Sequence, residues 1–242
     1  MRVLLIADIH ANLIALEAVV EDAGPVDAVW CLGDVVGYGP RPNECCAWVE
    51  EHAAATVVGN HDRACLGRLD LREFNASARQ ATRWTIDRLT PRAHDWLDGL
   101  PERVVEGDRT LVHGSPRDPV WEYILGPAQA LPSFGHFDTD LCLVGHTHIP
   151  AVFSEAPLRR GERPHKPGHG ESIALTAGRY IVNPGSVGQP RDGDPRAAYA
   201  LYDPEARRIE FRRLAYDIGA TQRQMAGEGL PSLLIARLAH GL

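Results

Sequence analysis

Short apolar runs alternate with longer amphipathic segments along the first 60 residues. The runs that begin at Val3 (VLLIA), Val26 (VDAVWCLG) and Thr56 (TVVG) are rich in β-branched and aliphatic residues, which favours strands. Residues 13–21 and 43–52 carry their apolar side chains at helical spacing. This βαβαβ order predicts a mainly parallel sheet with right-handed crossovers.

The pattern changes over about residues 63–100, which are rich in Arg and Ala and have apolar residues at helical spacing. We expect a helical insert here, acting as a lid or as one wall of a pocket. Strands resume in RTLVHG from Arg109 and in DLCLVG from Asp140. The stretch 154–170 is dense in Pro, Gly and basic residues and predicts a long, solvated loop.

The last third of the chain combines β segments with a helical tail. The β segments begin at Tyr180, Ala197 and Arg207, and we expect the last two to form a hairpin. An amphipathic helical tail over about 217–242 completes a single domain over residues 1–242. Its apolar stripe either caps the core, which we favour, or forms a homodimer contact: Leu230, Leu233, Leu234 and Leu238.

Composition narrows the class of protein. A hydrophobic content of 44% and a charged content of 24% are ordinary for a soluble globular domain. The net charge of -7 argues against sequence-independent nucleic-acid binding. Five cysteines without C-x-x-C spacing argue against a disulfide framework or a zinc ribbon. No apolar stretch reaches membrane-spanning length, and the first run, broken by Asp8, favours a strand over a signal peptide. We therefore expect a cytoplasmic protein.

Polar residues able to bind a metal follow each of five apolar runs. They are Asp8 and His10, then Asp34, then Asn60 and His61, then His113, and finally His146 and His148. The carboxyl ends of parallel strands share one sheet edge, so these groups are expected to converge there. Residues two apart in extended backbone point the same way, which would aim both members of a pair at one site. Their oxygen and nitrogen atoms suit Mn, Fe or Zn.

Each of these residues also has a simpler interpretation when it is considered alone. An Asp after a strand is more often a helix cap or a turn residue. A lone histidine such as His113 is more often a hydrogen-bonded structural residue than a ligand. The joint placement at five strand ends favours a shared metal site over these separate explanations.

The same blocks resemble a known family. D-x-H at Asp8, G-D at Gly33, G-N-H-D at Gly59, H-G at His113 and G-H-T-H at Gly145 occur in this order. The pattern resembles the calcineurin-like metallophosphoesterase superfamily, nearest to small prokaryotic phosphoesterases related to diadenosine tetraphosphatase. The resemblance implies a four-layer αββα sandwich of α/β (α+β) class, with two mixed β-sheets and a metal site at the carboxyl edge of the strands.

The resemblance also implies roles for individual residues around two divalent transition-metal ions. One ion would be held by Asp8, His10 and His148, the other by Asn60, His113 and His146, with Asp34 bridging both. Asn12 would support the ligands of the first ion. His61 would protonate or stabilise the leaving-group oxygen as a catalytic residue. Asp62, the second candidate catalytic residue, could orient His61 or cap the following segment.

One departure from the family concerns the residues after Asp34. Protein phosphatases of this superfamily have a D-R-G block, whereas here residues 35–39, directly after the bridging Asp, read VVGYG and contain no Arg. The departure argues against protein phosphatase activity and leaves the substrate phosphate in need of another donor. Arg191, in the QPRDG segment, is either that donor or a solvated loop residue.

These inferences predict a phosphoesterase that hydrolyses a phosphomonoester or phosphodiester by in-line attack of a metal-bridging hydroxide. His61 would act as the general acid. The neutral amide of Asn60 would leave the site net positive and attractive to a phosphate. The substrate would be a small phosphoester, with nucleotides as candidates. The alternatives are a non-catalytic scaffold on the same fold and a dinucleoside polyphosphate hydrolase.

Overall fold

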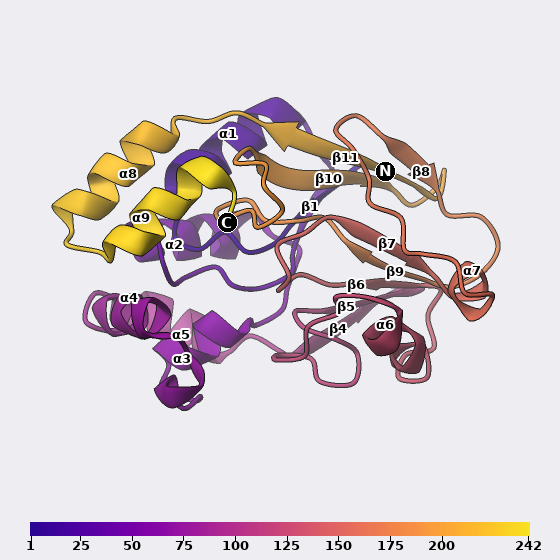
Figure 1. Ribbon diagram of the computed structural model, residues 1–242, viewed down its shortest axis with the longest axis horizontal. Helices are drawn as coiled ribbons and strands as arrows, with labels where there is room; N and C mark the ends of the chain where they lie inside the picture. The colour runs from indigo at the N-terminus through magenta and orange to yellow at the C-terminus, as the bar shows by residue number, and fades with distance from the viewer.

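Two β-sheets lie face to face at the centre of the computed structural model, which describes residues 1–242 (Figure 1). The first sheet has the order β3-β2-β1-β10-β11-β8, with β1 Val3–Ile6, β2 Ala28–Cys31, β3 Ala55–Thr56, β8 Ser172–Ala174, β10 Ala197–Asp203 and β11 Arg208–Leu214. The second has the order β4-β5-β6-β9-β7, with β4 Arg103–Glu106, β5 Arg109–Val112, β6 Leu141–Leu143, β7 Ala151–Ser154 and β9 Tyr180–Asn183. Both sheets are mixed, because each has a parallel set, β1-β2-β3 or β5-β6-β9, flanked by antiparallel strands.

Nine α-helices and two 3₁₀ helices surround the sheets. The helices are α1 Leu13–Ala23, α2 Pro42–His52, α3 Asn60–Cys65, α4 Ala76–Ile86, α5 Pro91–Asp98, α6 Pro127–Ser133, α7 Glu155–Arg159, α8 Ile218–Gly227 and α9 Ser232–Arg237, with η1 Leu71–Glu73 and η2 Leu238–His240. No helix is long and apolar enough to cross a membrane.

The layers follow from the alternation of side chains along the strands. In β1, Leu4 and Ile6 face helices α1 and α2, where they pack against residues such as Leu16. Val3 and Leu5 face the other sheet and share a core with its strands. The central strand therefore buries both of its faces, which explains why it is apolar throughout.

The second sheet divides its side chains in the same way. Leu111 and Leu143 point into the core between the sheets. Val112 and Val144 point outward and pack with Phe134, next to the end of α6. The order is helices, sheet, sheet, helices, and it confirms the expected four-layer αββα sandwich.

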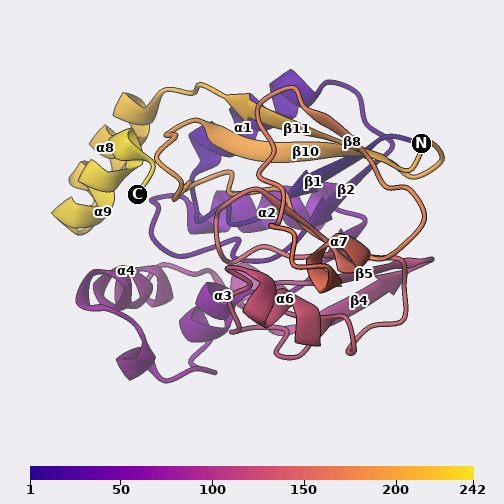
Figure 2. The same cartoon turned by 45° about the vertical axis from the view of Figure 1, so that its right-hand side comes forward.

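A separate apolar cluster joins the helical insert to the tail. We call α4, α8 and α9, together with the cluster between them, the helical roof; these helices lie on one side of the molecule in Figures 1 and 2. Phe74 and Ala78 from the insert share this cluster with Leu234 and Leu238 from the tail. Core packing is thereby confirmed for three of the four tail leucines, whereas Leu233 is 65% exposed.

The sequence pattern was wrong at several places. The mainly parallel sheet is mixed, because the C-terminal hairpin β10–β11 adds antiparallel to β1. β3 spans only Ala55–Thr56, since the backbone of Val58 pairs with Pro101 instead of with a neighbouring strand. The expected loop at 154–170 begins with helix α7, whose Arg159 pairs with Glu155 at 2.7 Å one turn earlier.

Candidate metal centre

Seven candidate ligands come together at one end of the two sheets. They are supplied by the loops after β1, β2, β5 and β6 and by the first turn of α3, and each is at most 3% exposed: Asp8, His10, Asp34, Asn60, His113, His146 and His148. The predicted convergence of separate strand ends is therefore present. Asn60 does not end a strand, however, because it opens helix α3.

The backbone of these loops differs from the expected extended form. Asp8, His10, Asp34, His146 and His148 all have φ between 48° and 67°, in the left-handed region. Non-glycine residues rarely adopt this conformation, and such backbone strain concentrates at functional sites. The prediction that i and i+2 side chains align along extended backbone was therefore wrong. The directions of these five side chains are set instead by tight turns of the backbone.

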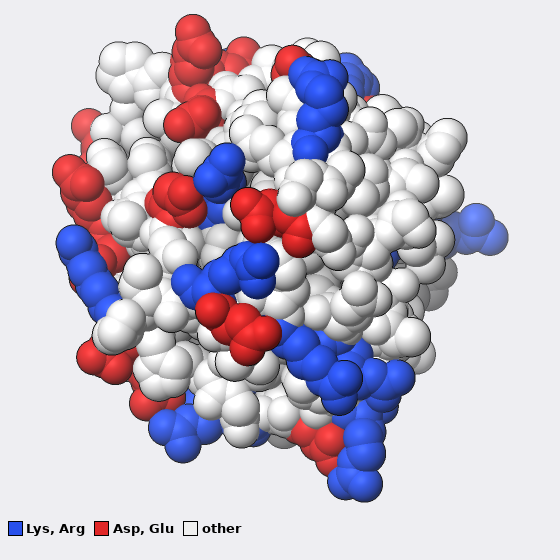
Figure 3. Space-filling view, turned by 90° about the vertical axis from the view of Figure 1, so that its left-hand side faces the viewer, with Lys and Arg blue, Asp and Glu red and all other residues white.

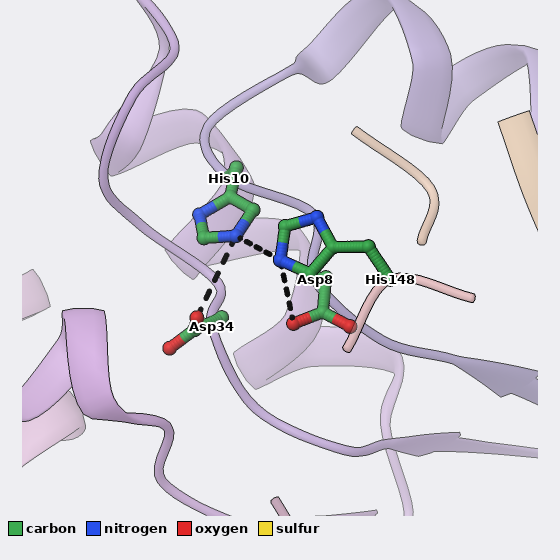
Figure 4. Close-up of side chains that lie close together, drawn as sticks. All are labelled: Asp8, His10, Asp34 and His148. Carbon is green, nitrogen blue, oxygen red and sulfur yellow. Dashed lines mark hydrogen bonds and ion pairs between the residues drawn. The ribbon is translucent and has the colours of Figure 1, made fainter. Parts of the chain in front are cut away.

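The first group of side chains surrounds Asp8 and His10 (Figure 4). The Nε2 atom of His10 lies 3.1 Å from the Nε2 atom of His148 and 3.5 Å from Oδ2 of Asp34. The Nε2 atom of His148 lies 3.4 Å from Oδ1 of Asp8. The ligand atoms of these four residues all lie within 4.8 Å of one another.

The second group lies on the other side of Asp34. The Nε2 atom of His113 lies 3.1 Å from Nδ1 of His146, 3.2 Å from Oδ1 of Asn60 and 3.4 Å from Oδ2 of Asp34. The same Asp34 oxygen thus faces both groups, yet it has no hydrogen-bond partner although it is buried. A buried carboxylate oxygen without a donor is costly unless a cation completes its surroundings.

The four histidines each use one ring nitrogen on a backbone carbonyl. The partners are Val36 for His10 at 3.1 Å, Leu32 for His113 at 2.7 Å, Trp121 for His146 at 3.0 Å and Gln189 for His148 at 2.5 Å. A carbonyl can only accept, so it places the proton on that nitrogen and leaves a lone pair on the other. The remaining nitrogens face one another in pairs 3.1 Å apart, which is the arrangement expected of metal-binding histidines.

The pKa shifts of three of the four histidines agree with this arrangement. Burial lowers the pKa of His10, His146 and His148 well below the usual value, so their rings are neutral. Burial also lowers the pKa of His113, but the carboxylate of Asp34 outweighs it and raises the pKa to about 9. Metal binding to His113 would therefore release a proton.

The donor set fits divalent transition metals. Imidazole nitrogens, two carboxylates and one amide oxygen are present, and no thiol is among them. The unpartnered oxygen of Asp34 lies within 3.5 Å of both His10 and His113. These residues are therefore suited to hold metal.

Gly59 permits the close packing beneath the site. A Cβ atom at this position would lie 2.1 Å from Oδ1 of Asp34 and 2.3 Å from the Asp34 backbone nitrogen. The loop after β2 and the start of α3 can touch only because this residue lacks a side chain.

Asp62 and His61 occupy different surroundings despite being neighbours. The Asp62 carboxylate accepts hydrogen bonds from the backbone N–H groups of Gly59 at 2.9 Å, Asp34 at 2.9 Å and Val36 at 3.0 Å. It makes no hydrogen bond to His61, so its contacts correspond to the capping alternative. Burial lowers the pKa of His61 to about 4, and its buried Nδ1 atom has no hydrogen-bond partner.

Asn12 and Arg191, the two remaining candidate residues, have different hydrogen-bond partners. Asn12 caps α1 and donates to the carbonyl of Gly188 at 3.0 Å and to the hydroxyl of Tyr216 at 3.1 Å, so it ties the β1 loop to the C-terminal part of the chain. Its side chain makes no hydrogen bond to a candidate ligand. Arg191 donates to the Tyr38 hydroxyl at 3.3 Å, and its Nε is buried without a partner.

A cavity of about 260 Å³ opens beside His61 and Asn60. The insert supplies part of its wall, as expected, and Arg191 lines it. Sequence reasoning missed the lining residues outside the insert: Tyr38, Trp121, Tyr123 and Arg237. Only Tyr38 carried a signal, because it lies within the GDVVGYGP block directly after Asp34.

Comparison with known proteins identifies the family. A sequence model of the calcineurin-like phosphoesterase superfamily domain matches residues 1–207, a span that includes all seven candidate ligands and His61. The chain belongs to the calcineurin-like phosphoesterase superfamily. It is accordingly a metal-dependent phosphoesterase.

Several relatives resemble this calcineurin-like phosphoesterase over most of its length. A solved metallophosphoesterase from Sphaerobacter thermophilus is 53% identical, with a TM-score of 0.94 and coverage of 100% of this chain and 99% of that one. The uncharacterised protein MJ0912 of Methanocaldococcus jannaschii is 38% identical over 98% of this chain and 96% of its own length. The phosphodiesterase YfcE of Escherichia coli K12 is 27% identical over 84% and 88% of the two chains.

Proposed function

We propose that this chain is a dinuclear-metal phosphoesterase that hydrolyses small phosphomonoesters or phosphodiesters. The observation that carries the proposal is the geometry around Asp34. One buried, unpartnered carboxylate oxygen faces two separate groups, each with a pair of imidazole nitrogens 3.1 Å apart. Asp8, His10 and His148 would hold one divalent ion, and Asn60, His113 and His146 the other. Mn, Fe and Zn are the candidates.

When bound, two such ions lower the pKa of a water to generate the nucleophile for in-line attack, and they offset the charge of the phosphate. The chain's own residues position and neutralise the substrate. The guanidinium of Arg191 faces the cavity next to Tyr38 and can donate to a non-bridging phosphate oxygen. This cation replaces the Arg that protein phosphatases have after the bridging Asp.

His61 would act on the leaving group. Its ring lines the cavity beside Asn60, and a neutral imidazole still carries one N–H that can donate to the departing oxygen. Asp62 would not transfer protons, because its buried carboxylate accepts hydrogen bonds from three backbone N–H groups and makes none to His61. Its proposed role is to hold the Asp34 turn against α3.

A turnover assay with metal analysis tests the proposal. The protein is stripped of metal, reloaded with Mn, Fe or Zn, and assayed on bis(p-nitrophenyl) phosphate and p-nitrophenyl phosphate. We expect turnover only in reloaded samples, and two metal equivalents per chain by elemental analysis. No turnover with any of the three metals would favour the non-catalytic scaffold. One equivalent with full activity would contradict the dinuclear site.

A further inference from the structure

The loop after Asp34 carries a tyrosine that lines the proposed substrate cavity. Tyr38 lies beside His61 in the cavity wall, is only 5% exposed and has a left-handed φ of 62°. Backbone strain of this kind in a non-glycine residue concentrates at functional sites. The next residue, Gly39, donates its backbone N–H to the carbonyl of His10 at 3.0 Å. Tyr38 is therefore tied directly to the loop that carries a candidate ligand.

The ring of Tyr38 packs against both parts of the site. Its centroid lies 4.5 Å from that of His10 and 4.3 Å from that of His61. The ring also belongs to the apolar cluster of the helical roof, together with Phe74 and Leu238. Contacts on several sides hold the ring, and with it the hydroxyl, in one place.

The hydroxyl of Tyr38 has a proton that the protein does not use. The phenol oxygen accepts a hydrogen bond of 3.3 Å from Nη2 of Arg191, and the hydroxyl makes no other hydrogen bond. A guanidinium can only donate, so this bond occupies a lone pair of the oxygen and leaves its O–H free. A phenol is protonated at neutral pH. One O–H donor therefore remains for an acceptor that enters the cavity.

Arg191 supplies further donors next to this hydroxyl. Its hydrogen-bond partners are both neutral: the hydroxyl of Tyr38 and the side-chain oxygen of Gln189 at 3.1 Å. Its buried Nε atom has no partner. The guanidinium and the phenol O–H are thus adjacent donors on one wall of the cavity, and an anionic phosphate oxygen is an acceptor that suits both.

The outer surface offers little attraction for a phosphate. Figure 3 views the side of the molecule that carries the roof, and over most of it basic and acidic side chains alternate. Charges of opposite sign that alternate in this way largely cancel one another's field. Recognition of the phosphate therefore depends on the donors inside the cavity.

We propose that Tyr38 is a further catalytic residue, whose O–H donates to a non-bridging oxygen of the substrate phosphate while Arg191 donates to the phenol oxygen. The inference rests on the proposed phosphoesterase function and adds a substrate contact to it. The bond from Arg191 makes the phenol a stronger donor, because hydrogen bonds in a chain polarise one another. No proton is transferred; the O–H stabilises the negative charge on the phosphoryl oxygens.

Binding of inorganic phosphate to metal-loaded protein, freed of excess metal by gel filtration, tests the assignment. Tyr38→Phe keeps the ring and its packing but removes the O–H. We expect calorimetry to show about tenfold weaker phosphate binding with metal content unchanged. Tyr202→Phe is the matched control: Tyr202 is also buried, pairs with Val3 at the start of β1, and accepts from Arg109 at 3.0 Å. Unchanged phosphate affinity, or loss of metal, in Tyr38→Phe would overturn the assignment.

A double variant separates direct donation from support of Arg191. In an Arg191→Gln background, Tyr38→Phe should still weaken phosphate binding by about threefold or more. The absence of any further loss would mean that the hydroxyl acts only through Arg191, and would overturn the assignment. Turnover of bis(p-nitrophenyl) phosphate, measured separately, reports the proposed function. Wild-type protein that binds phosphate through Tyr38 but hydrolyses no ester would overturn that function alone.

Discussion

The loops that carry the candidate ligands and the helical roof enclose the same cavity, but different forces hold them in place. In the loops, backbone geometry determines where side chains point: Asp8, Asp34 and His146 adopt left-handed φ angles, and backbone carbonyls orient every ring. In the roof, side-chain packing determines position. Phe74 and Leu234, 160 residues apart, meet in one apolar cluster.

This difference suggests that the loops determine metal binding and catalysis, whereas the roof determines substrate affinity. Strained turns held by hydrogen bonds tolerate little change, as the metal-binding chemistry requires. A roof held by apolar contacts can change its residues while it keeps its volume. We therefore expect substitutions in the loops to remove metal or turnover, and substitutions in the roof to alter stability or substrate affinity while the metal content stays unchanged.

The largest effect should come from Asp34→Asn. Asp34 faces both ligand groups, and the amide removes the negative charge that the two proposed ions would share. We expect turnover of bis(p-nitrophenyl) phosphate to fall by more than about 10⁴-fold and metal content to drop, because residues that act as one unit fail together. Asp95→Asn, at an 84% exposed side chain, is the control. Full metal content with turnover within tenfold of wild type would contradict a bridging role.

Asn60→Asp should produce the next largest loss of turnover. It adds a negative charge to the site, whereas Asp34→Asn removes one. A carboxylate here keeps an oxygen ligand but adds negative charge beside Asp34, which weakens the attraction for phosphate. We expect metal content to be retained and kcat/KM to fall by about 10²- to 10³-fold. Elemental analysis and steady-state kinetics on the same sample test this. Wild-type turnover would show that the neutrality of Asn60 has no functional role.

His61→Gln should have a smaller effect that depends on the leaving group. Glutamine keeps a polar side chain of similar length but cannot transfer a proton. On an alkyl phosphoester we expect a loss of about 10²-fold or more, whereas p-nitrophenolate departs without protonation and should lose less than about tenfold. Kinetics on a methyl and a p-nitrophenyl ester of the same phosphate measure the difference. Equal losses on both esters would indicate a role in binding instead of leaving-group departure.

The contrast between loops and roof also explains how much the sequence could reveal. The ligand blocks are contiguous, and each follows an apolar run, so seven candidate ligands could be named without coordinates, although Asn60 opens α3 and does not end a strand. The loop angles could not be foreseen, because the strained turns at Asp8 and His148 depend on contacts such as the one between the Asp8 carbonyl and the backbone N–H of Gly188.

The roof was less predictable for a physical reason. Helical spacing identified the insert and the tail, but nothing local indicates that α9 packs over the cavity. Arg237 stands among leucines with no motif around it, so its place follows only from the burial of Leu234 against the insert. The short strand β8 was missed as well. Its three residues are too few to predict a strand by themselves, and they form one by pairing with β11.

The smallest effect on turnover should come from the roof itself, where two adjacent leucines offer a matched pair. Leu234 is 1% exposed and Leu233 is 65% exposed. Leu234→Ala should lower the free energy of unfolding by about 2–4 kcal/mol because it leaves a cavity, whereas Leu233→Ala should change it by less than about 0.5 kcal/mol. Urea unfolding at fixed metal loading measures both.

Metal content and turnover of the same two leucine variants test whether packing in the roof affects the metal site. Because the apolar cluster that holds Leu234 includes none of the candidate ligands, its substitution should leave two metal equivalents in place. It should also change turnover of bis(p-nitrophenyl) phosphate far less than the loop variants do. Loss of metal in Leu234→Ala would mean that the roof and the strand-end loops form a single cooperative unit, in which the tail helps to set the metal geometry.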